Sequence, residues 1–288
     1  MNAPPPLTDR NALARNRARA AAAPNHSSAL FLQEEVAVEI QERLAEVNRR
    51  FTNVAVITAE PDLWRSVLPG ARLLADEPVL DLAPGAHDLV IHAMCMHWAD
   101  DPTGQIVQCA RALRPDGMFL AALFGGRTLH ELRACLAEAE AELTGGLSPR
   151  VLPMGEIRDL GSLLQRAGLA LPVADTQVRT VSYRDALHLM SDLRAMGEGN
   201  ALAGRLRRFT RRDVIGAAAA RYADTFGQAD GRLRATFEII FLTGWAQDPG
   251  QQKPLRPGSA VQRLADALGA AESPLPRDTL PAERGRQG

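Results

Sequence analysis

The sequence predicts an α/β fold in which a mostly parallel sheet carries helices on both faces. Short apolar runs alternate along the chain with longer amphipathic stretches, which is the order expected of strand–helix units. The first run, residues 54–57, is rich in β-branched residues and has no polar positions, which indicates a strand buried on both faces. The length of 288 residues, with 46% hydrophobic content, suffices for one large domain with additions.

The first half of the chain predicts four strands and the helices between them. A helix at 29–47 has apolar residues at helical spacing with glutamates outside that stripe, and Ser27 or Ser28 caps its start. A helix at 101–113 stops at the turn signal of residues 114–117. The strands expected here lie at 54–57, 71–76, 88–94 and 118–124, and further helical segments at 61–67 and 129–143.

After Gly145 and Gly146 the pattern becomes largely helical, and we expect a helical insertion at about 145–230. It includes one strand with polar positions at 171–181, and a long apolar strand at 235–245 completes the sheet. The helices expected in this half lie at 157–167, 183–196 and 213–226. The domain boundaries that follow are a basic flexible arm at 1–28, a main domain at 29–248, and a Pro-, Gln- and Gly-rich tail at 249–288.

The charge balance argues against a nucleic-acid partner, because 33 Lys and Arg face 34 Asp and Glu. Three cysteines are too few for a disulfide framework, which favours a reducing, cytoplasmic location. No run approaches the ~18 to 20 apolar residues of a transmembrane helix. The Arg- and Ala-rich start is typical of a transit peptide and equally of a basic surface helix. Such a basic arm can contact a membrane surface, which would place the protein at the inner face of the membrane.

Several motifs occur in a fixed order along nearly the whole chain, from about Asp9 to Leu268. They include FLQEEV at 31–36, MHWADD at 96–101, LRPDG at 113–117, FGGRTL at 124–129, GGLSP at 145–149 and MGEGN at 196–200. This set resembles the methyltransferase-fold assembly factors of respiratory complex I and their alphaproteobacterial relatives. A more distant similarity is to the carrier-protein methyltransferase of biotin synthesis.

The resemblance implies a Rossmann-like class I methyltransferase fold with an S-adenosylmethionine (SAM) pocket at the carboxyl ends of the first strands. It also implies a protein substrate, namely a subunit of a respiratory complex. In the complex I assembly branch the implied activity is hydroxylation of an arginine rather than methylation.

The loop after the first strand departs from the family pattern. A class I methyltransferase has glycines there, because a Cβ would collide with SAM. Here Ala59 and Glu60 follow the strand, Pro61 comes next, and no glycine occurs before Gly70. The interval from Glu60 to Asp88 is also too short for two crossovers, so one strand–helix unit is lost or shrunken. Two interpretations follow: SAM binding that is weakened or lost, or binding in an altered pocket.

The cofactor-side candidates lie where the first three strands end. Asp76 or Glu77 can stand for the acid that clasps the ribose or for the acid that meets the adenine, and Trp98 can stack on the adenine. The full set is Ala59, Glu60, Asp76, Glu77, Met94 and Trp98.

Two residues are catalytic candidates. His97, just past a strand end, can act as a base, or it can cap the next helix. Tyr183 can face the cleft or be buried with its hydroxyl satisfied. The substrate-side candidates come from two glycine-bearing loops, which tight turns and helix caps explain equally well. They are Gly125 and Gly126 in one loop and Met196, Gly197, Glu198 and Asn200 in the other. No residue spacing indicates a metal site.

Three functions are therefore open. The first is a methyltransferase-fold protein that acts on or binds a protein subunit, and the second is an active SAM-dependent methyltransferase of a protein or a carrier-bound acid. The third is a non-enzymatic scaffold. An open cleft between Ala59, Asp76 and Met94 favours an enzyme, whereas a cleft filled by a side chain such as Trp64 favours the scaffold.

Overall fold

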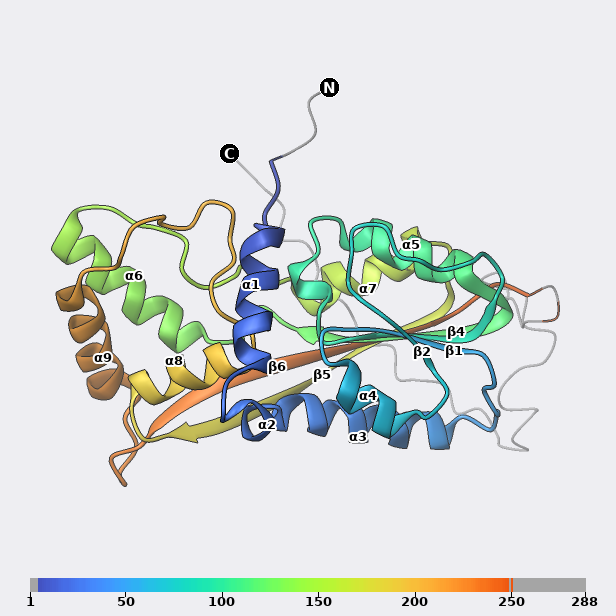
Figure 1. The fold of residues 1–288 in the computed structure, drawn as a ribbon, viewed down its shortest axis with the longest axis horizontal. Helices are drawn as coiled ribbons and strands as arrows, with labels where there is room; N and C mark the ends of the chain where they lie inside the picture. Colours follow the sequence, from blue (N-terminus) through green and yellow to red (C-terminus); the bar gives the residue numbers. More distant parts are fainter. Residues whose placement is uncertain (1–4, 249, 251–288) are drawn as a thin grey trace, which may run out of the picture. The chain divides into compact units, whose positions relative to one another are not determined.

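The computed structural model describes residues 5–248 and residue 250, and a six-stranded sheet forms their centre (Figure 1). The strand order is β2-β1-β3-β4-β6-β5, in which the first four strands are parallel. β6 runs antiparallel to both of its neighbours. This arrangement confirms the predicted α/β fold class. The strands are β1 (Val54–Thr58), β2 (Arg72–Leu74), β3 (His87–Ala93), β4 (Leu113–Phe124), β5 (Ala170–Tyr183) and β6 (Leu233–Trp245).

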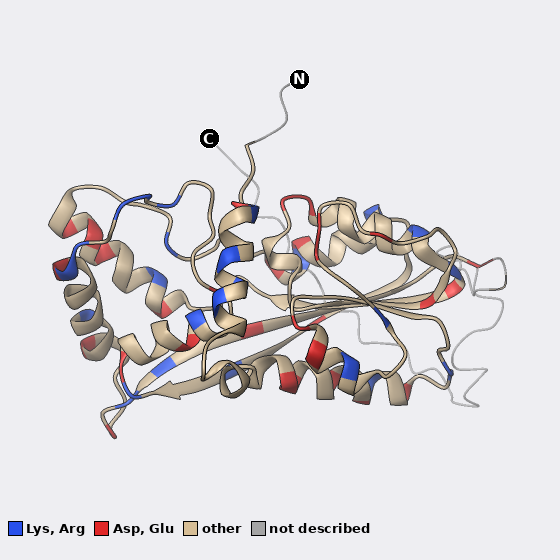
Figure 2. Ribbon diagram, viewed as in Figure 1, with Lys and Arg blue, Asp and Glu red and all other residues tan. Residues whose placement is uncertain are grey.

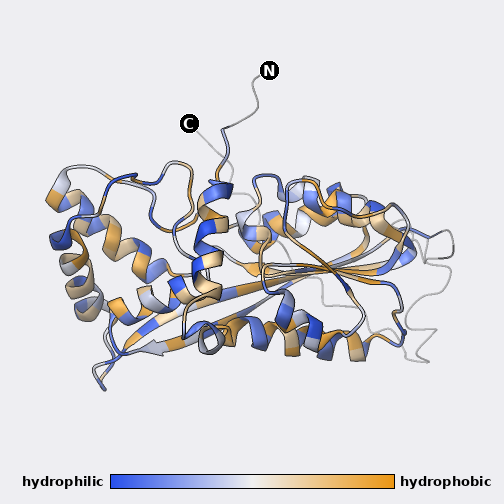
Figure 3. Ribbon diagram, viewed as in Figure 1, coloured by the Kyte–Doolittle hydropathy of each residue, from blue (hydrophilic) through white to orange (hydrophobic). Residues whose placement is uncertain are grey.

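The buried strands separate two apolar layers, one on each face of the sheet. Successive side chains of a strand point to opposite faces, so Val56 lies in the larger core cluster while Ala55 and Ile57 lie in the other. Figure 3 shows hydrophobic residues concentrated on the central strands. Strand pairing and two-sided burial explain the continuous apolar runs of the sequence.

Helices cover both faces of the sheet (Figure 1). Buried side chains of α3, α4, α6, α8 and α9 contribute to the larger core cluster, and those of α5 and α7 to the smaller one. The helices are α1 (Arg10–Ala21), α2 (His26–Ala29), α3 (Phe31–Glu46), α4 (Pro61–Val67), α5 (Pro102–Ala112), α6 (His130–Thr144), α7 (Ile157–Arg166), α8 (Ala186–Ala195) and α9 (Arg212–Phe226), with a short 3-10 helix η1 (Met96–Trp98). Asp101 caps α5 by accepting a hydrogen bond from the Gly104 N–H.

The segment between β1 and β3 is short, as the sequence predicts. It contains only α4 and the three-residue β2, which pairs with β1 at the edge of the sheet. One strand–helix unit of the expected fold is therefore missing here. As a result, the residues after β2 lie directly beside those after β1.

The flexible arm predicted at 1–28 is wrong for its described part. Residues Arg10–Ala21 form α1, which begins at the N-cap Asp9. The chain before it is also held, because the Leu7 and Thr8 N–H groups donate to the Asp100 carboxylate and Thr8 pairs with Leu202. A composition rich in Arg and Ala does not reveal these partners, because they lie far away in the sequence.

The second half of the chain is less helical than an insertion at 145–230 suggests. α7, α8 and α9 lie there, but β5 separates them and belongs to the main sheet. The predicted tail at 249–288 lies outside the described residues except for Gly250. None of the helices described here is long and apolar enough to cross a membrane.

Candidate functional site

The carboxyl ends of β1, β2 and β3 meet at one edge of the sheet, where ligands of open α/β folds bind. β1 leads into a loop of two residues before Pro61 begins α4, and the Glu60 N–H donates to Thr58 Oγ1 at 2.9 Å. This turn replaces the glycine loop of the family pattern. The carboxylate of Glu60 contacts His26 Nε2 at 3.2 Å, and burial raises the pKa of Glu60.

Asp76 follows β2 and is buried, but two arginines of α1 already bind it. Arg17 donates to both carboxylate oxygens, from Nη1 to Oδ1 at 2.5 Å and from Nη2 to Oδ2 at 3.2 Å. Arg10 donates to Oδ2 at 3.3 Å and also to the Asp76 backbone carbonyl. Burial by itself raises the pKa of Asp76, but the two guanidinium groups outweigh it and hold that pKa below its ordinary value. Asp76 is therefore ionised and fully engaged.

A cavity of about 450 Å³ lies beside Asp76, between the strand ends and α1. Ala59, Asp76 and Glu77 line it, whereas Met94 is buried in the larger core cluster. Trp64 is also buried in that core, so it does not fill the cleft. The cleft is therefore not filled by a core side chain. Residues of α1, among them Arg10 and Arg17, form one of its walls.

The class I fold implies SAM as the cofactor at this edge, but the residues as they stand do not fit it. A ribose needs a carboxylate with a free oxygen, and both oxygens of Asp76 accept hydrogen bonds from arginine. The loop after β1 has a proline instead of glycines, which removes a backbone donor.

Glu198 is a second acid at this edge, and its side chain is 13% exposed. Its Oε2 accepts a hydrogen bond from Trp98 Nε1 at 2.8 Å and lies 3.2 Å from His97 Nε2. Burial alone raises the pKa of Glu198, but the His97, Arg17 and Trp98 contacts prevail and lower it. Among the residues that the structure describes, hydrogen bonds to Glu198 reach only Oε2, so Oε1 can still accept one.

His97 is positioned by η1, which follows β3 directly. Its ring is buried, with its centroid 4.9 Å from that of Phe124 and 5.9 Å from that of Trp98. Nδ1 is buried with no hydrogen-bond partner among the residues that the structure describes. His97 therefore holds Glu198 through Nε2 and does not cap a helix through its side chain.

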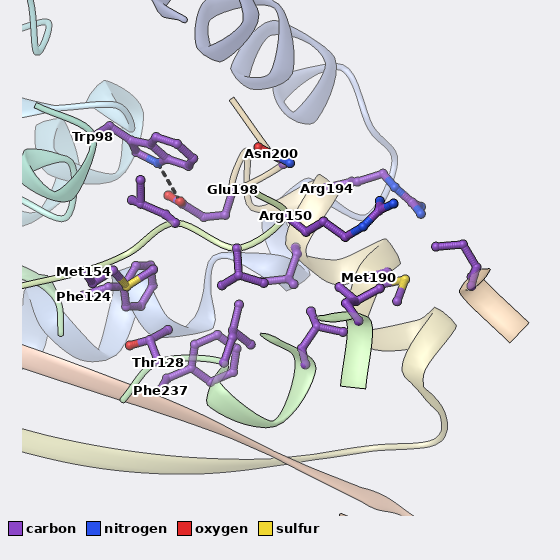
Figure 4. A pocket seen from close by; sticks show the side chains of 18 residues that line it. Trp98, Phe124, Thr128, Arg150, Met154, Met190, Arg194, Glu198, Asn200 and Phe237 are labelled. Atoms are coloured by element: carbon purple, nitrogen blue, oxygen red, sulfur yellow. Dashed lines mark hydrogen bonds between the residues drawn. The ribbon is translucent and has the colours of Figure 1, made fainter. Parts of the chain in front are cut away.

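A mostly apolar cavity of about 290 Å³ opens beside Glu198 (Figure 4). In this view Trp98 and Phe124 lie at one end, and Met190 and Arg194 at the other. Its polar lining comes from Thr128, Arg150, Arg194, Glu198 and Asn200, and its apolar lining includes Phe124, Leu132, Leu152, Met154, Leu193 and Phe237. We call this space the Glu198 cavity.

The loop at 196–200 belongs to the site because of how α8 ends. Gly197 has φ +81°, a left-handed conformation that ends a helix and that favours glycine. The Glu198 N–H donates back to the Leu193 carbonyl, and the Asn200 side chain donates to the Pro149 carbonyl at 2.9 Å. Glu198 and Asn200 line the cavity, whereas Met196 and Gly197 do not.

The structure gives Gly125 and Gly126 a role in close packing. A Cβ on Gly125 would collide with the Glu238 carboxylate, and one on Gly126 with the Glu156 carboxylate. Neither glycine lines the Glu198 cavity, although Phe124 before them does. The turn interpretation of these glycines is the one that the geometry supports.

Tyr183 lies at the end of β5 inside the larger core cluster and is 2% exposed. Its ring faces His188 at 5.5 Å, and burial raises its pKa. It lines neither of the two cavities described above. The structure therefore does not bring Tyr183 together with His97.

The site also contains residues that sequence reasoning missed. Arg10 and Arg17 engage Asp76, and Arg150 and Arg194 line the Glu198 cavity. For Arg10 and Arg17 the basic N-terminal run is the one sequence signal, and it indicates a basic surface rather than an ion pair with Asp76. Figure 2 shows the basic residues along α1. No group of three His, Cys, Asp or Glu side chains with metal-binding geometry occurs in the described part of the chain.

Comparison with known proteins agrees with this fold. Residues 34–121 match the family model described as a methyltransferase domain. The chain is 39% identical to the arginine-hydroxylase NDUFAF5, mitochondrial, of Danio rerio over 201 residues, which cover 70% of this chain and 62% of that protein. For the human protein of the same name the identity is 38%, covering 73% of this chain and 60% of the relative.

A malonyl-[acyl-carrier protein] O-methyltransferase of Xylella fastidiosa is 34% identical, covering 62% of this chain and 58% of that protein. The chain thus spans about three fifths of the length of these curated relatives. Together with the strand order, these matches support a class I methyltransferase-fold family for this chain. Within that family its similarity is to proteins named as arginine hydroxylases and as carrier-protein methyltransferases.

Proposed function

We propose that this chain binds a subunit of a respiratory complex by accepting an arginine side chain of that subunit in the Glu198 cavity. The resemblance to complex I assembly factors suggests the partner. Relatives at 38–39% identity are named arginine hydroxylases, which suggests an arginine as the group that is bound. SAM binding is weakened in the arrangement described, because the α1 arginines occupy Asp76. We place the protein in the cytoplasm, at the inner face of the membrane.

The observation that carries this proposal is an ionised carboxylate in a mostly apolar cavity, where one of the two lining arginines, Arg150, is already paired with Glu140. An arginine has a long apolar stem and a planar cationic head, so it suits a cavity whose walls are apolar and whose one acid is held in place. Trp98 and His97 fix Glu198 through Oε2, and Oε1 is left for a guanidinium N–H. The rings of Trp98 and Phe124 add faces on which a guanidinium can stack.

His97 is, in this proposal, a positioning residue that orients Glu198. Tyr183, the other catalytic candidate, has no part in it, because it lies in the core away from the cavity. Asn200 shapes the cavity wall, since its amide is already engaged with the Pro149 carbonyl and the Leu202 N–H.

The test is complementation of a strain from which the gene has been deleted. Wild-type protein is expected to restore the amount and NADH-oxidising activity of assembled complex I, and Glu198→Gln to restore about a tenth or less. Glu34→Gln on the exposed side of α3 is the matched control and is expected to behave as wild type. Normal complex I in the deletion strain, or full rescue by Glu198→Gln, would contradict the proposal.

A second candidate function is methyl transfer to a carrier-bound acid, and Arg194 favours it. This exposed arginine lines the same cavity, forms no ion pair with another residue in the described part of the chain, and can bind a carboxylate or a phosphate. Arg194→Ala and Glu198→Gln separate the two functions, since loss of function with Arg194→Ala alone would indicate an acidic ligand. A scaffold without chemistry is favoured by the engaged Asp76, and it would need the subunit but no cofactor.

A further inference from the structure

We propose that helix α1 is an internal strap over the cofactor edge of the sheet, and that an adenosine-containing ligand reaches Asp76 only after Arg10 and Arg17 have left it. This inference concerns the cavity beside Asp76, so it goes beyond the proposed function and does not rest on it. In this view the arginines of α1 are the reason that the site at Asp76 does not fit the cofactor that the fold implies.

The contacts of the two arginines carry the proposal. Arg10 and Arg17 lie seven residues apart on α1, about two helical turns, so both side chains leave the same face of the helix. That face meets Asp76, where their hydrogen bonds use both carboxylate oxygens and the backbone carbonyl. A ribose diol needs the same carboxylate oxygens as acceptors, so ribose and arginines compete for Asp76.

The strap is also fixed at the substrate side of the edge. The Asp9 N–H donates to the Ala201 carbonyl at 2.8 Å, and the Asn16 side chain donates to the Gly199 carbonyl at 2.9 Å. Leu13 packs in a small cluster with Trp98 and Ala201. α1 therefore bridges the acid after β2 and the loop that carries Glu198.

The geometry allows the arginines to move without unfolding the sheet. The side chains of Arg10 and Arg17 are 27% and 18% exposed, and they line the open cavity beside Asp76. The only strand partner of this segment in the described residues is the single Thr8–Leu202 bridge. Release of α1 would thus break its ion pairs, the hydrogen bonds of Asp9 and Asn16 to the loop at 199–201, and one small apolar cluster, while the main core clusters stay intact.

The test is calorimetric titration of the full-length protein with S-adenosylhomocysteine. Arg10→Gln/Arg17→Gln is expected to bind it at least tenfold more tightly than the wild type. Arg15→Gln/Arg19→Gln removes the same charge from the exposed side of the same helix and is expected to bind like the wild type. Equal or weaker binding by Arg10→Gln/Arg17→Gln overturns the proposal, as does an equal gain in the control.

The Arg10→Gln/Arg17→Gln variant leaves Asp76 without its partners and can fail to fold. Two further measurements therefore use a milder variant and the wild-type protein. Arg10→Lys/Arg17→Lys keeps both charges but loses the paired guanidinium contacts, and it is expected to bind more tightly than wild type by a smaller factor. Hydrogen exchange of residues 10–21 in the wild type is expected to speed up at millimolar S-adenosylhomocysteine. Unchanged or slower exchange, together with no gain in the lysine variant, overturns the strap. Both measurements read out S-adenosylhomocysteine at Asp76 and use Glu198 unchanged, so their failure is distinguishable from failure of the Glu198→Gln complementation.

Discussion

At the scale of single residues, two carboxylates define this edge of the sheet, and they differ in what they leave free. Asp76 accepts from guanidinium groups at both oxygens, whereas Glu198 is held through Oε2 by Trp98 and His97. Arg17 is close enough to influence both, since it helps to lower the pKa of each acid. Arg17 thus favours the ionised form of both Asp76 and Glu198, which line two different cavities.

The Asp76 ion pairs predict a large loss of stability on Asp76→Asn. A buried ion pair that loses one partner leaves the other charge uncompensated, which costs about 3 to 5 kcal/mol. Arg17 would be that charge, because its side chain is only 18% exposed. Urea unfolding at neutral pH measures the change.

The control for this prediction is Asp62→Asn on α4. Asp62 pairs with Arg65, but both side chains are largely exposed, so this pair contributes about 1 kcal/mol or less. Similar losses for the two substitutions would show that the α1 arginines do not depend on Asp76.

At the scale of elements, the end of α8 sets the position of Glu198, and α1 rests on it. Gly197 ends the helix, and a Cβ at this position would lie 3.3 Å from Arg17 Cγ. Asn16 binds the next glycine in the chain through its backbone carbonyl. The segment that ends α8 therefore both caps that helix and contacts α1.

Gly197→Ala is expected to destabilise the protein by about 1 kcal/mol, because an alanine at φ +81° is strained. The thermal midpoint should fall accordingly, and complex I assembly should fall with it. Gly216→Ala is the matched control, since this glycine lies inside α9 with nothing within 4 Å of an added Cβ. Gly216→Ala is expected to raise the free energy of unfolding by about 0.5 to 1 kcal/mol. A lower free energy of unfolding in both variants would contradict a special role of Gly197 in ending α8.

At the scale of the whole molecule, the sheet could be predicted from the sequence far better than the site. The apolar run at 54–57 predicts β1, and the short interval from Glu60 to Asp88 predicts the missing strand–helix unit. These signals are local and periodic. The α1–Asp76 contacts join residues 59 and 66 positions apart, and such pairs leave no pattern in a single sequence. Tyr183 shows the same limit, because its position beside β5 does not reveal which face of the sheet it meets.

The buried His92 predicts how the stability of the whole molecule depends on pH. His92 is fully buried, contacts Gln105 Oε1 at 2.7 Å through Nε2, and has its pKa lowered by burial to about 4. The unfolded chain binds a proton near the ordinary pKa of about 6.5, and the folded chain does not until about pH 4. The free energy of unfolding should therefore fall as the pH drops from about 6.5 to about 4, by up to ~1.4 kcal/mol per pH unit.

Denaturant unfolding at a series of pH values checks this window. His92→Gln removes the titrating group and is expected to flatten the slope, whereas His188→Gln on the exposed side of α8 should leave it unchanged. An equally steep slope in His92→Gln would assign the acid sensitivity to other groups.

The contacts of α1 have a consequence for the order in which the protein folds on the ribosome. Arg17 and Asp76 are 59 positions apart and can meet early, while Asn16 must wait for Gly199, which is synthesised 183 residues later. Native pairings between distant residues form slowly, because chain entropy opposes them. The Glu198 loop is thus assembled on a helix whose acid comes earlier in the chain, and the Glu198 cavity is complete only after Phe237 has been synthesised.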